Sequence, residues 1–357
     1  MLIFLLLLIA LAAFLQYWSM GHSLDGLEHL CFPDRPLVEP GEVFHLVNRV
    51  TNRTRRFVPW LRVSQVIPKE LTLLDGARSV TPYNGEHNAL NYAVYLLPRQ
   101  TWRQELRATM SRRGRYPLTN TVLQGGGFLG FNELVGYTTQ HEEIIVLPPR
   151  CADLGLQNTL GGFLGDRSVD RFIQEDPVLT LGFREYTGRE PMKHISWTQS
   201  ARSGQLMVKK FDYTLEPTAA VLLNIDADRT EGWEDRLEKC FSMARTVCES
   251  LEEQRIPYRF VTNAAAAGAI SLWSQVSDGL GDRHLTTILE GLGRAGYDPL
   301  RSFDQMLEQA ARSAEQGRTH ILITPEPDPR RSHGIRRLEQ LCGTRLLVLT
   351  AEEVFPA

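Results

Sequence analysis

The hydrophobic pattern of the chain changes near residue 150, and the two halves require different kinds of sheet. Before this point, apolar and polar residues alternate in short segments bounded by proline, glycine and asparagine, as in strands that bury one face. These segments are residues 43–52, 57–67, 90–97, 101–110 and 141–148. Several short strands at this spacing predict a small antiparallel β-sandwich over residues 21–150.

The second half alternates strand and helix patterns. AAVLLNID, residues 219–226, is a continuous apolar run, as in a strand buried on both faces of a parallel sheet. Residues 233–255 then predict a helix, because apolar residues recur every three or four positions. Further strand and helix segments follow up to residue 354, which predicts an open doubly wound α/β domain over residues 216–357.

Composition excludes several classes of protein. The 357 residues are 43% hydrophobic and 23% charged, which suits a globular chain of two domains. A net charge of -3 without a long basic run excludes a nucleic-acid partner. The five cysteines are odd in number and form no C-x-x-C pair, so we expect reduced, structural thiols. Cys240 and Cys248 fall on one predicted helix, about 12 Å apart, and should both be buried.

The N-terminal residues 1–20 are uncharged and long enough to cross a bilayer as a helix. Tyr17 and Trp18 suit the headgroup interface and favour a retained anchor. A secretory signal peptide is the alternative, but no basic residue precedes the apolar run. The first arginines follow the segment, which predicts a single-pass protein of the cell membrane whose soluble part is cytoplasmic.

Two G-x-G-x-x-G matches are present, and neither has the context of a dinucleotide site. Gly125, Gly127 and Gly130 are not followed by a long helix and a second parallel strand. The match at residues 291–296 comes after a helical segment instead of before one. We expect turns at both places. Metalloprotease, Walker and hydrolase-elbow motifs are absent from the sequence.

Oxygen-bearing side chains follow the first apolar strand of the second half. Asp226, Asp228 and Thr230 alternate on a strand-to-helix loop, where ligands gather in α/β folds and where carboxylates bind Mg²⁺. The other interpretation is that Asp228 or Thr230 caps the helix that follows. Capping is favoured, because no second cluster of such side chains is evident.

The segment GREPMKHISWTQSARSGQLMVKKFD, residues 188–212, combines tryptophan, serine and basic residues. Ser196 and Gln199 fit a capping box and Gly204 a helix terminator, which predicts a two-turn helix. Trp197 is expected to be a buried anchor, so that its replacement by alanine would cost on the order of 3 to 5 kcal/mol. The spacing places no base beside Ser200, so a catalytic nucleophile is not expected there.

Residues 182–211 resemble the signature of the bacterial family called domain of unknown function 58. The signature positions shared with that family are Arg184, Tyr186, Gly188, Trp197, Ser200 and Arg202, with Ile195, Ala201, Leu206 and Val208 in register. The resemblance implies a membrane-anchored chain with a β-domain and a von Willebrand factor A-like domain. It also implies a MoxR-type AAA+ ATPase as partner, for which such proteins are thought to act as adaptors without enzymatic activity.

The chain departs from that family at three places. The usual Gly-Asp is Gly188-Arg189 here, and one apolar N-terminal segment stands where the family has two. The metal-ion-dependent adhesion site of A-type domains is also incomplete. Asp226, Asp228 and Thr230 fill its first motif imperfectly, Thr286 or Thr287 would supply its second, and Thr324-Pro325 replaces its last. A degenerate site is therefore expected, with weak Mg²⁺ binding or none.

Together these patterns predict an anchor over residues 1–20, a β-sandwich domain over 21–150, the signature segment over 151–215 and an A-type α/β domain over 216–357. The expected function is a non-enzymatic adaptor at the membrane that binds a protein partner, a MoxR-type ATPase. The alternatives are a metal-dependent enzyme centred on Asp226 and Asp228, and an envelope-facing binding module.

Overall fold

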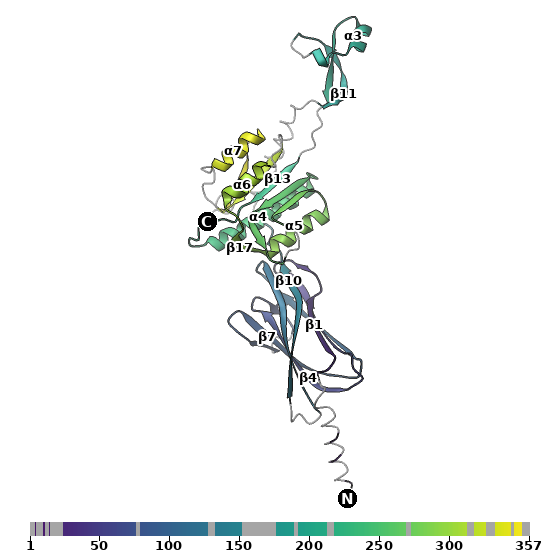
Figure 1. The fold of residues 1–357 in the computed structure, drawn as a ribbon, viewed down its shortest axis with the longest axis vertical. Coiled ribbons are helices and arrows are strands. Elements are labelled where there is room, and N and C mark those ends of the chain that lie inside the picture. Colours follow the sequence, from purple (N-terminus) through teal and green to yellow (C-terminus); the bar gives the residue numbers. More distant parts are fainter. Residues whose placement is uncertain are drawn as a thin grey trace. The chain divides into compact units, whose positions relative to one another are not determined.

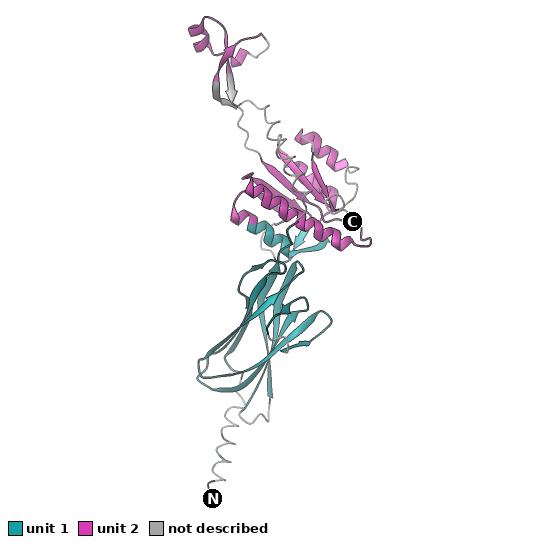
Figure 2. Cartoon of the chain, turned by 180° about the vertical axis from the view of Figure 1, so that it is seen from behind, with its two compact units in different colours: residues 1–150, 264–273, 286–298 teal, residues 151–263, 274–285, 299–357 magenta. Residues whose placement is uncertain are grey.

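The computed structural model describes residues 4, 10, 14, 24–75, 79–127, 133–151, 176–188, 192–212, 218–268, 273–312, 318–325, 333–343 and 346–351. The chain divides into two compact units, coloured separately in Figure 2. The first unit comprises residues 1–150, 264–273 and 286–298, and the second comprises residues 151–263, 274–285 and 299–357.

Two β-sheets form most of the first unit. The four-stranded sheet has the order β1-β3-β8-β5, and the six-stranded sheet has the order β2-β10-β9-β4-β7-β6. Neighbouring strands are antiparallel, except that β2 is parallel to β10. The strands are β1 (Leu27–Pro33), β2 (Leu37–Val38), β3 (Val43–Asn52), β4 (Val58–Pro68), β5 (Thr72–Leu73), β6 (Val80–Pro82), β7 (His87–Leu96), β8 (Thr101–Thr109), β9 (Gly114–Gly126) and β10 (Glu133–Val146).

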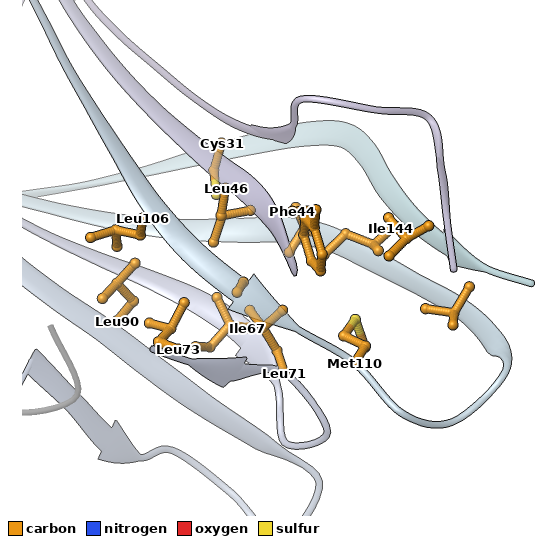
Figure 3. Close-up of a cluster of buried hydrophobic side chains, with 14 residues drawn as sticks. Cys31, Phe44, Leu46, Ile67, Leu71, Leu73, Leu90, Leu106, Met110 and Ile144 are labelled. Carbon is orange, nitrogen blue, oxygen red and sulfur yellow. The ribbon is translucent and has the colours of Figure 1, made fainter. Parts of the chain in front are cut away.

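The core between these sheets follows from the alternation of apolar residues. In β3, Phe44, Leu46 and Val50 are at most 1% exposed, whereas Val43 and Arg49 on the same strand are exposed. Figure 3 shows Phe44 and Leu46 gathered with apolar side chains from other strands, among them Ile67, Leu90 and Leu106. Strand β3 has the bounds that the sequence predicts, whereas β10 begins eight residues before the predicted segment.

The later segments of the first unit are held by an arginine. They include β15 (Ala264–Ala266), which pairs with β17 (Ala295–Pro299), and the C-terminal half of helix α5 (Asp282–Arg294). Arg113, 7% exposed, donates through Nη1 to the carbonyl oxygens of Leu292 at 2.8 Å and Ala295 at 2.7 Å. Carbonyl groups at a helix C-terminus lack intrahelical partners and carry partial negative charge, so a buried cation stabilises this end of α5.

A five-stranded sheet organises the second unit, in the order β16-β14-β13-β18-β19 (Figure 1). Four strands are parallel, and β16 is antiparallel to β14. All residues of β13 and β18 are buried, as in strands covered on both faces. The strands are β13 (Ala219–Leu223), β14 (Tyr258–Thr262), β16 (Gln275–Gly279), β18 (Thr319–Thr324) and β19 (Leu347–Thr350).

Helices cover this sheet through apolar faces. Helix α4 (Trp233–Glu253) packs against β13 and β18, close to the bounds that its periodicity predicts. Helices α6 (Phe303–Arg312) and α7 (His333–Cys342) pack together over Leu222, Val261 and Leu322. Cys240 and Cys248 lie free and buried in α4, as predicted, and burial raises the pKa of both thiols.

The predicted N-terminal anchor is wrong. Within the described residues, no helix is long and apolar enough to cross a membrane. Only Phe4, Ala10 and Phe14 of residues 1–23 are described, and the rest of that segment lies outside the described residues. Apolar composition alone does not separate a membrane span from the apolar part of a signal peptide or a buried helix. The expected localisation, a single-pass protein of the cell membrane with a cytoplasmic soluble part, depended on this anchor and is corrected with it.

The predicted fold class is also wrong in combining a membrane helix and a doubly wound A-type domain with the β-sandwich; of these parts, two packed sheets do form the first unit. Strands dominate the regular structure that is described, and the helices there are α3 to α7 with one 3-10 turn. The sheet of the second unit is mixed, because the polar strand β16 joins it antiparallel. Apolar runs between amphipathic helices occur in many mixed sheets, so the pattern could not specify an A-type domain.

Candidate functional site

Two regions of the second unit contain the residues that the sequence singles out. The first is the carboxyl end of β13, β14 and β18, where ligands bind in open α/β sheets. Asn224 and Asn263, both at most 1% exposed, follow β13 and β14. Asn263 donates to Asn224 Oδ1 at 2.7 Å, and Asn224 donates to the hydroxyl of Thr324 at 3.0 Å. A chain of buried hydrogen bonds therefore joins the three strand ends.

Asp226 serves this framework as a helix cap. Its Oδ2 accepts the backbone N–H of Phe303, the first residue of α6, at 3.0 Å. Its own N–H donates to Asn224 Oδ1 at 2.9 Å. A carboxylate at a helix N-terminus satisfies an unpaired donor and meets the positive end of the helix dipole. Asp226 therefore fixes the start of α6, which is not the helix that follows it in the sequence.

Asp228 and Thr230 do not cap α4, contrary to the expectation for one of them. The N-cap of α4 is Gly232, and no side chain caps that end. Instead, the Arg236 guanidinium donates to Thr230 Oγ1 at 2.8 Å and to the carbonyl oxygen of Asp228 at 3.4 Å. A cationic side chain thus binds the Thr230 hydroxyl and lies beside Asp228, where a metal ion would have to bind.

These residues do not fit a divalent cation. Asp226 is engaged with α6, and Arg236 brings positive charge to the next two oxygen-bearing residues. Thr286 and Thr287 lie in the middle of helix α5 instead of on a loop. In the part of the chain that is described, no group of three or more His, Cys, Asp or Glu residues has the arrangement of a metal site. These contacts therefore give no support to Mg²⁺ binding at the degenerate site, where weak binding or none was expected.

We expect Asp226→Ala to lower the free energy of unfolding by about 1 kcal/mol, since the Phe303 N–H loses its acceptor. Asp226→Asn keeps an oxygen at the same position and should cost less. Urea unfolding of both variants measures the difference. Calorimetric binding of Mg²⁺ that disappears in Asp226→Ala would contradict the capping role and restore the metal site.

The second region is the signature module, which we define as residues 182–209. Strands β11 (Asp176–Glu185) and β12 (Met207–Asp212) pair antiparallel, and helix α3 (Trp197–Ser203) lies between them in sequence (Figure 1). A 3-10 turn, η2 (Met192–His194), precedes α3. Gly204, at φ 70°, ends the helix in the left-handed conformation that glycine adopts without strain. The predicted two-turn helix and its terminator are confirmed.

Ser200 holds the helix of the signature module to β12. Its hydroxyl donates to the carbonyl oxygen of Ser196 at 2.8 Å and accepts the N–H of Met207 at 2.8 Å. Ser196 makes no side-chain capping bond, so the capping box with Gln199 is wrong. Instead, Ser196 is fixed by its backbone, which donates to the carbonyl oxygen of Met207 at 2.8 Å. Ser200 therefore has a structural role.

The other signature positions fall around this framework. Tyr186, half-buried, donates its backbone N–H to the carbonyl oxygen of Leu206 at 2.8 Å. Arg184 pairs with Val208 across the hairpin, and both Arg184 and Arg202 are exposed. Gly188 has a φ of 86°, while Arg189 lies outside the described residues. The signature is therefore brought together in one module, mainly through its backbone.

Trp197 is not buried, which corrects the expectation of an apolar anchor. Its side chain is 62% exposed, and Met192, Leu206 and Phe183 are 68%, 45% and 41% exposed. Only Ile195, Ser196 and Val208 are buried among the residues of the signature module whose side chains are described. So small a module has too few buried positions to enclose the indole, and four large apolar side chains remain at its surface.

The exposed charged side chains that are described in the signature module are mainly basic. They are Lys193, Arg184, Arg202 and Lys209, and Glu185 is the one acidic residue among those described; Glu190 lies outside the described residues. The whole chain has a net charge of -3, so the net charge of these exposed side chains is opposite in sign to that of the whole chain. Sequence reasoning missed Phe183 and Met192 and did not expect Leu206 to be exposed, because isolated apolar residues in short strands and turns resemble core positions. It also missed Asn224 and Asn263, although both follow apolar strand patterns directly.

Comparisons with known proteins give little beyond this geometry. No protein-family model matches the chain, and no curated protein matches it. A CARDB domain from Pyrococcus furiosus is similar at 15% identity over 34% of this chain and 90% of that chain, with a TM-score of 0.21. A cohesin module from a Clostridium perfringens family 33 glycoside hydrolase is similar at 12% identity over 34% and 96%, with a TM-score of 0.23.

The third similar structure, trypsin-activated alpha-2-macroglobulin from Escherichia coli, shares 11% identity over 48% of this chain and 9% of that one, with a TM-score of 0.25. None of the three is described as a von Willebrand factor A-like domain or as associated with a MoxR protein. The expected A-type description therefore receives no support. Similarity at this level also carries no argument about function.

Proposed function

We propose that the protein is a non-enzymatic adaptor that binds another protein through the exposed apolar side chains of the signature module. The observation that carries this proposal is the exposure of Trp197, Met192, Leu206 and Phe183 on one small module. Grouped exposed apolar residues mark interaction surfaces in proteins, whereas single ones need no explanation.

The kind of residue supports the same function. Tryptophan and arginine are enriched among the residues that contribute most to protein–protein binding, and Trp197 is accompanied by exposed Arg184 and Arg202. The hydrogen bonds of Ser200 and the backbone fix α3 before a partner arrives, which reduces the entropy lost on binding. The resemblance of residues 182–211 names a MoxR-type AAA+ ATPase as the first partner to test.

A metal-dependent enzyme is the weaker candidate. It requires Asp226 and Asp228 to coordinate a cation, yet Asp226 caps α6 and Arg236 binds beside Asp228. A catalytic serine in the signature is equally disfavoured, because the Ser200 hydroxyl is engaged with Ser196 and Met207. Both observations favour a protein-binding function over a catalytic one.

Trp197→Ala is expected to leave stability almost unchanged and to weaken partner binding. An exposed side chain contributes within about 0.5 kcal/mol to folding, whereas loss of an interface tryptophan costs about 2 kcal/mol or more, roughly 30-fold in Kd. Thermal melting and co-purification with the MoxR-type ATPase measure the two effects. Tyr137→Ala, at an exposed aromatic residue of the first unit, is the matched control.

Two outcomes would contradict this proposal. If Trp197→Ala melts several degrees lower, the tryptophan supports the fold and its exposure has been misinterpreted as a binding feature. If the variant melts normally and retains the ATPase as well as Tyr137→Ala does, the signature module does not contact that partner.

A further inference from the structure

A layer of polar side chains divides the core of the first unit into two apolar clusters. On β3, Asn48 lies between Leu46 of one cluster and Val50 of the other. Gln65 has the same place on β4, and Thr121 has it on β9. All three polar side chains are at most 1% exposed. Buried polar groups destabilise a core unless they are hydrogen-bonded, so the packing of the two sheets depends on the hydrogen bonds of this layer.

His29 of β1 joins the two sheets through the polar layer. It is 2% exposed. Its Nε2 lies 2.9 Å from the Tyr92 hydroxyl on β7, and its Nδ1 lies 3.1 Å from the Thr121 hydroxyl on β9. Because β1 belongs to the four-stranded sheet and β7 and β9 to the six-stranded one, these bonds cross from sheet to sheet. Gln140 on β10 adds a second link through both backbone groups of Cys31.

The direction of each hydrogen bond follows from the far end of this chain of side chains. Gln65 donates its amide nitrogen to two backbone carbonyl oxygens, and its Oε1 accepts the Thr121 hydroxyl. Because that hydroxyl has one hydrogen, its oxygen accepts from Nδ1–H of His29. Nε2 then has no hydrogen and accepts the O–H of Tyr92. The chain therefore holds a neutral imidazole in one tautomer.

These partners do not accommodate a second proton on His29. An imidazolium donates from both nitrogens, so the Tyr92 hydroxyl would have to change from donor to acceptor. The hydrogen of that hydroxyl would then lose the acceptor that it has now. Protonation therefore breaks a hydrogen bond between the sheets and leaves a buried cation in its place.

Within the described residues, the surroundings of His29 provide no counter-charge. The titratable groups beside it are Tyr92 and Cys31, and burial raises the pKa of both, so both are neutral. The acidic residues Glu28 and Glu142 have exposed side chains, and Glu143 is paired with Arg115. The side chains that β3, β4, β9 and β10 contribute to the layer are uncharged: Asn48, Gln65, Thr121 and Gln140.

We propose that the polar layer is an acid-sensitive switch, in which protonation of His29 reverses the hydrogen-bond chain and releases β1 from the six-stranded sheet. Cys31 lies on the same strand and leaves the core with it. The inference concerns the first unit and does not depend on the function proposed for the signature module.

The pH range of the switch follows from the burial of the ring. Burial lowers the pKa of His29 from 6.5 to about 4. An opened β1 therefore takes up a proton as the pH falls below 6.5, whereas the closed strand stays neutral until about pH 4. The closed state has its full stability above this range and loses stability as the pH falls through it. Between pH 7 and pH 5, the population of the opened state should rise roughly 20-fold.

Labelling of Cys31 in the full chain tests the switch, because this thiol is fully buried beside His29. Dithiodipyridine reacts with thiols in acid, and mass spectrometry of the labelled peptides gives a rate for each cysteine. Each rate is divided by the rate of the same thiol in the urea-unfolded protein at the same pH. The ratio for Cys31 should rise roughly 20-fold from pH 7 to pH 5, and the ratio for Cys240 in the second unit less than about threefold.

Two variants and one spectroscopic measurement assign the effect to His29. His29→Gln keeps a polar side chain that does not titrate, so the rise at Cys31 should drop below about threefold. His141→Gln removes an exposed histidine of β10 and should retain the rise of roughly 20-fold. Nitrogen-15 chemical shifts of the His29 ring need no substitution: they should show the Nδ1–H tautomer at pH 7 and a mainly neutral ring at pH 5.

The proposal fails on any one of the following results. An unchanged ratio for Cys31 at pH 5 would show that acid does not open β1. An equal rise at Cys240 would show that acid loosens the whole chain, and a full rise in His29→Gln would assign the titration to another group. A His29 ring that carries its proton on Nε2 at pH 7, or that is mainly cationic at pH 5, would contradict the hydrogen-bond chain itself.

Discussion

Gly291→Ala is expected to destabilise the first unit more than any other single methyl addition considered. A Cβ at Gly291 would overlap the indole Nε1 of Trp273, a side chain that is only 4% exposed. The indole cannot yield easily, because its N–H donates to the carbonyl oxygen of Ile288 at 3.3 Å. Alanine ordinarily stabilises a helix by about 1 kcal/mol over glycine, but the overlap reverses the sign.

Forcing an extra methyl group into a packed core costs typically 1–3 kcal/mol and sometimes more. We therefore expect a net loss of about 3 kcal/mol in the free energy of unfolding. Urea unfolding measures the total, and hydrogen exchange of residues 286–298 measures the local opening. Gly296→Ala is the matched control: it belongs to the same glycine motif and its Cβ would meet nothing within 4 Å.

An unchanged free energy of unfolding in Gly291→Ala would show that Trp273 does not pack against α5 in solution. A loss of the same size in Gly296→Ala would attribute the effect to backbone freedom at this motif instead of to packing. The expected pattern, a large effect at one glycine and none at the other, requires the contact that the structure shows.

This glycine motif shows where sequence reasoning succeeds and where it stops. The position of residues 291–296 after a helical segment argued against a dinucleotide site, but the turn expected there is wrong. Gly291 and Gly293 lie inside α5, where Gly293 would bring a Cβ within 2.6 Å of Ile145. The requirement for glycine comes from residues distant in sequence, and no local pattern contains that information.

The signature module shows the same limit of local sequence patterns at the candidate site. The bounds of α3 and the left-handed Gly204 follow from local residues, and both were predicted. The burial of Trp197 depends on what packs over α3, which the local sequence does not specify, and the prediction failed there. The same holds for Asp226: its carboxylate was expected to act locally, yet it caps a helix that begins at residue 303.

Asn263→Ala is expected to cost about 3 kcal/mol in the free energy of unfolding, the second largest effect. The side chain accepts the N–H of Ile225 at 2.8 Å and donates to Asn224 Oδ1 at 2.7 Å and to the carbonyl oxygen of Arg301 at 3.2 Å. Ile225 and Asn224 are at most 1% exposed. Their polar atoms would lose a partner without gaining water, and each such loss costs about 1–3 kcal/mol.

The control for Asn263→Ala is Asn91→Ala in the first unit. Asn91 also makes three side-chain hydrogen bonds, with Ser64, Thr81 and Ala89, but it is only half-buried. Water can replace those bonds, so a loss below about 1 kcal/mol is expected. Equal losses in the two variants would mean that burial of the strand ends does not strengthen their hydrogen bonds.

The same variant separates architecture from function at the carboxyl ends of the strands. If Asn224, Asn263 and Thr324 only hold β13, β14 and β18 together, Asn263→Ala should retain partner binding at temperatures well below its melting point. Binding lost from a fully folded Asn263→Ala protein would instead place the partner at the strand ends. In that case the Asp226 loop, and not the signature module, would be the functional surface of the second unit.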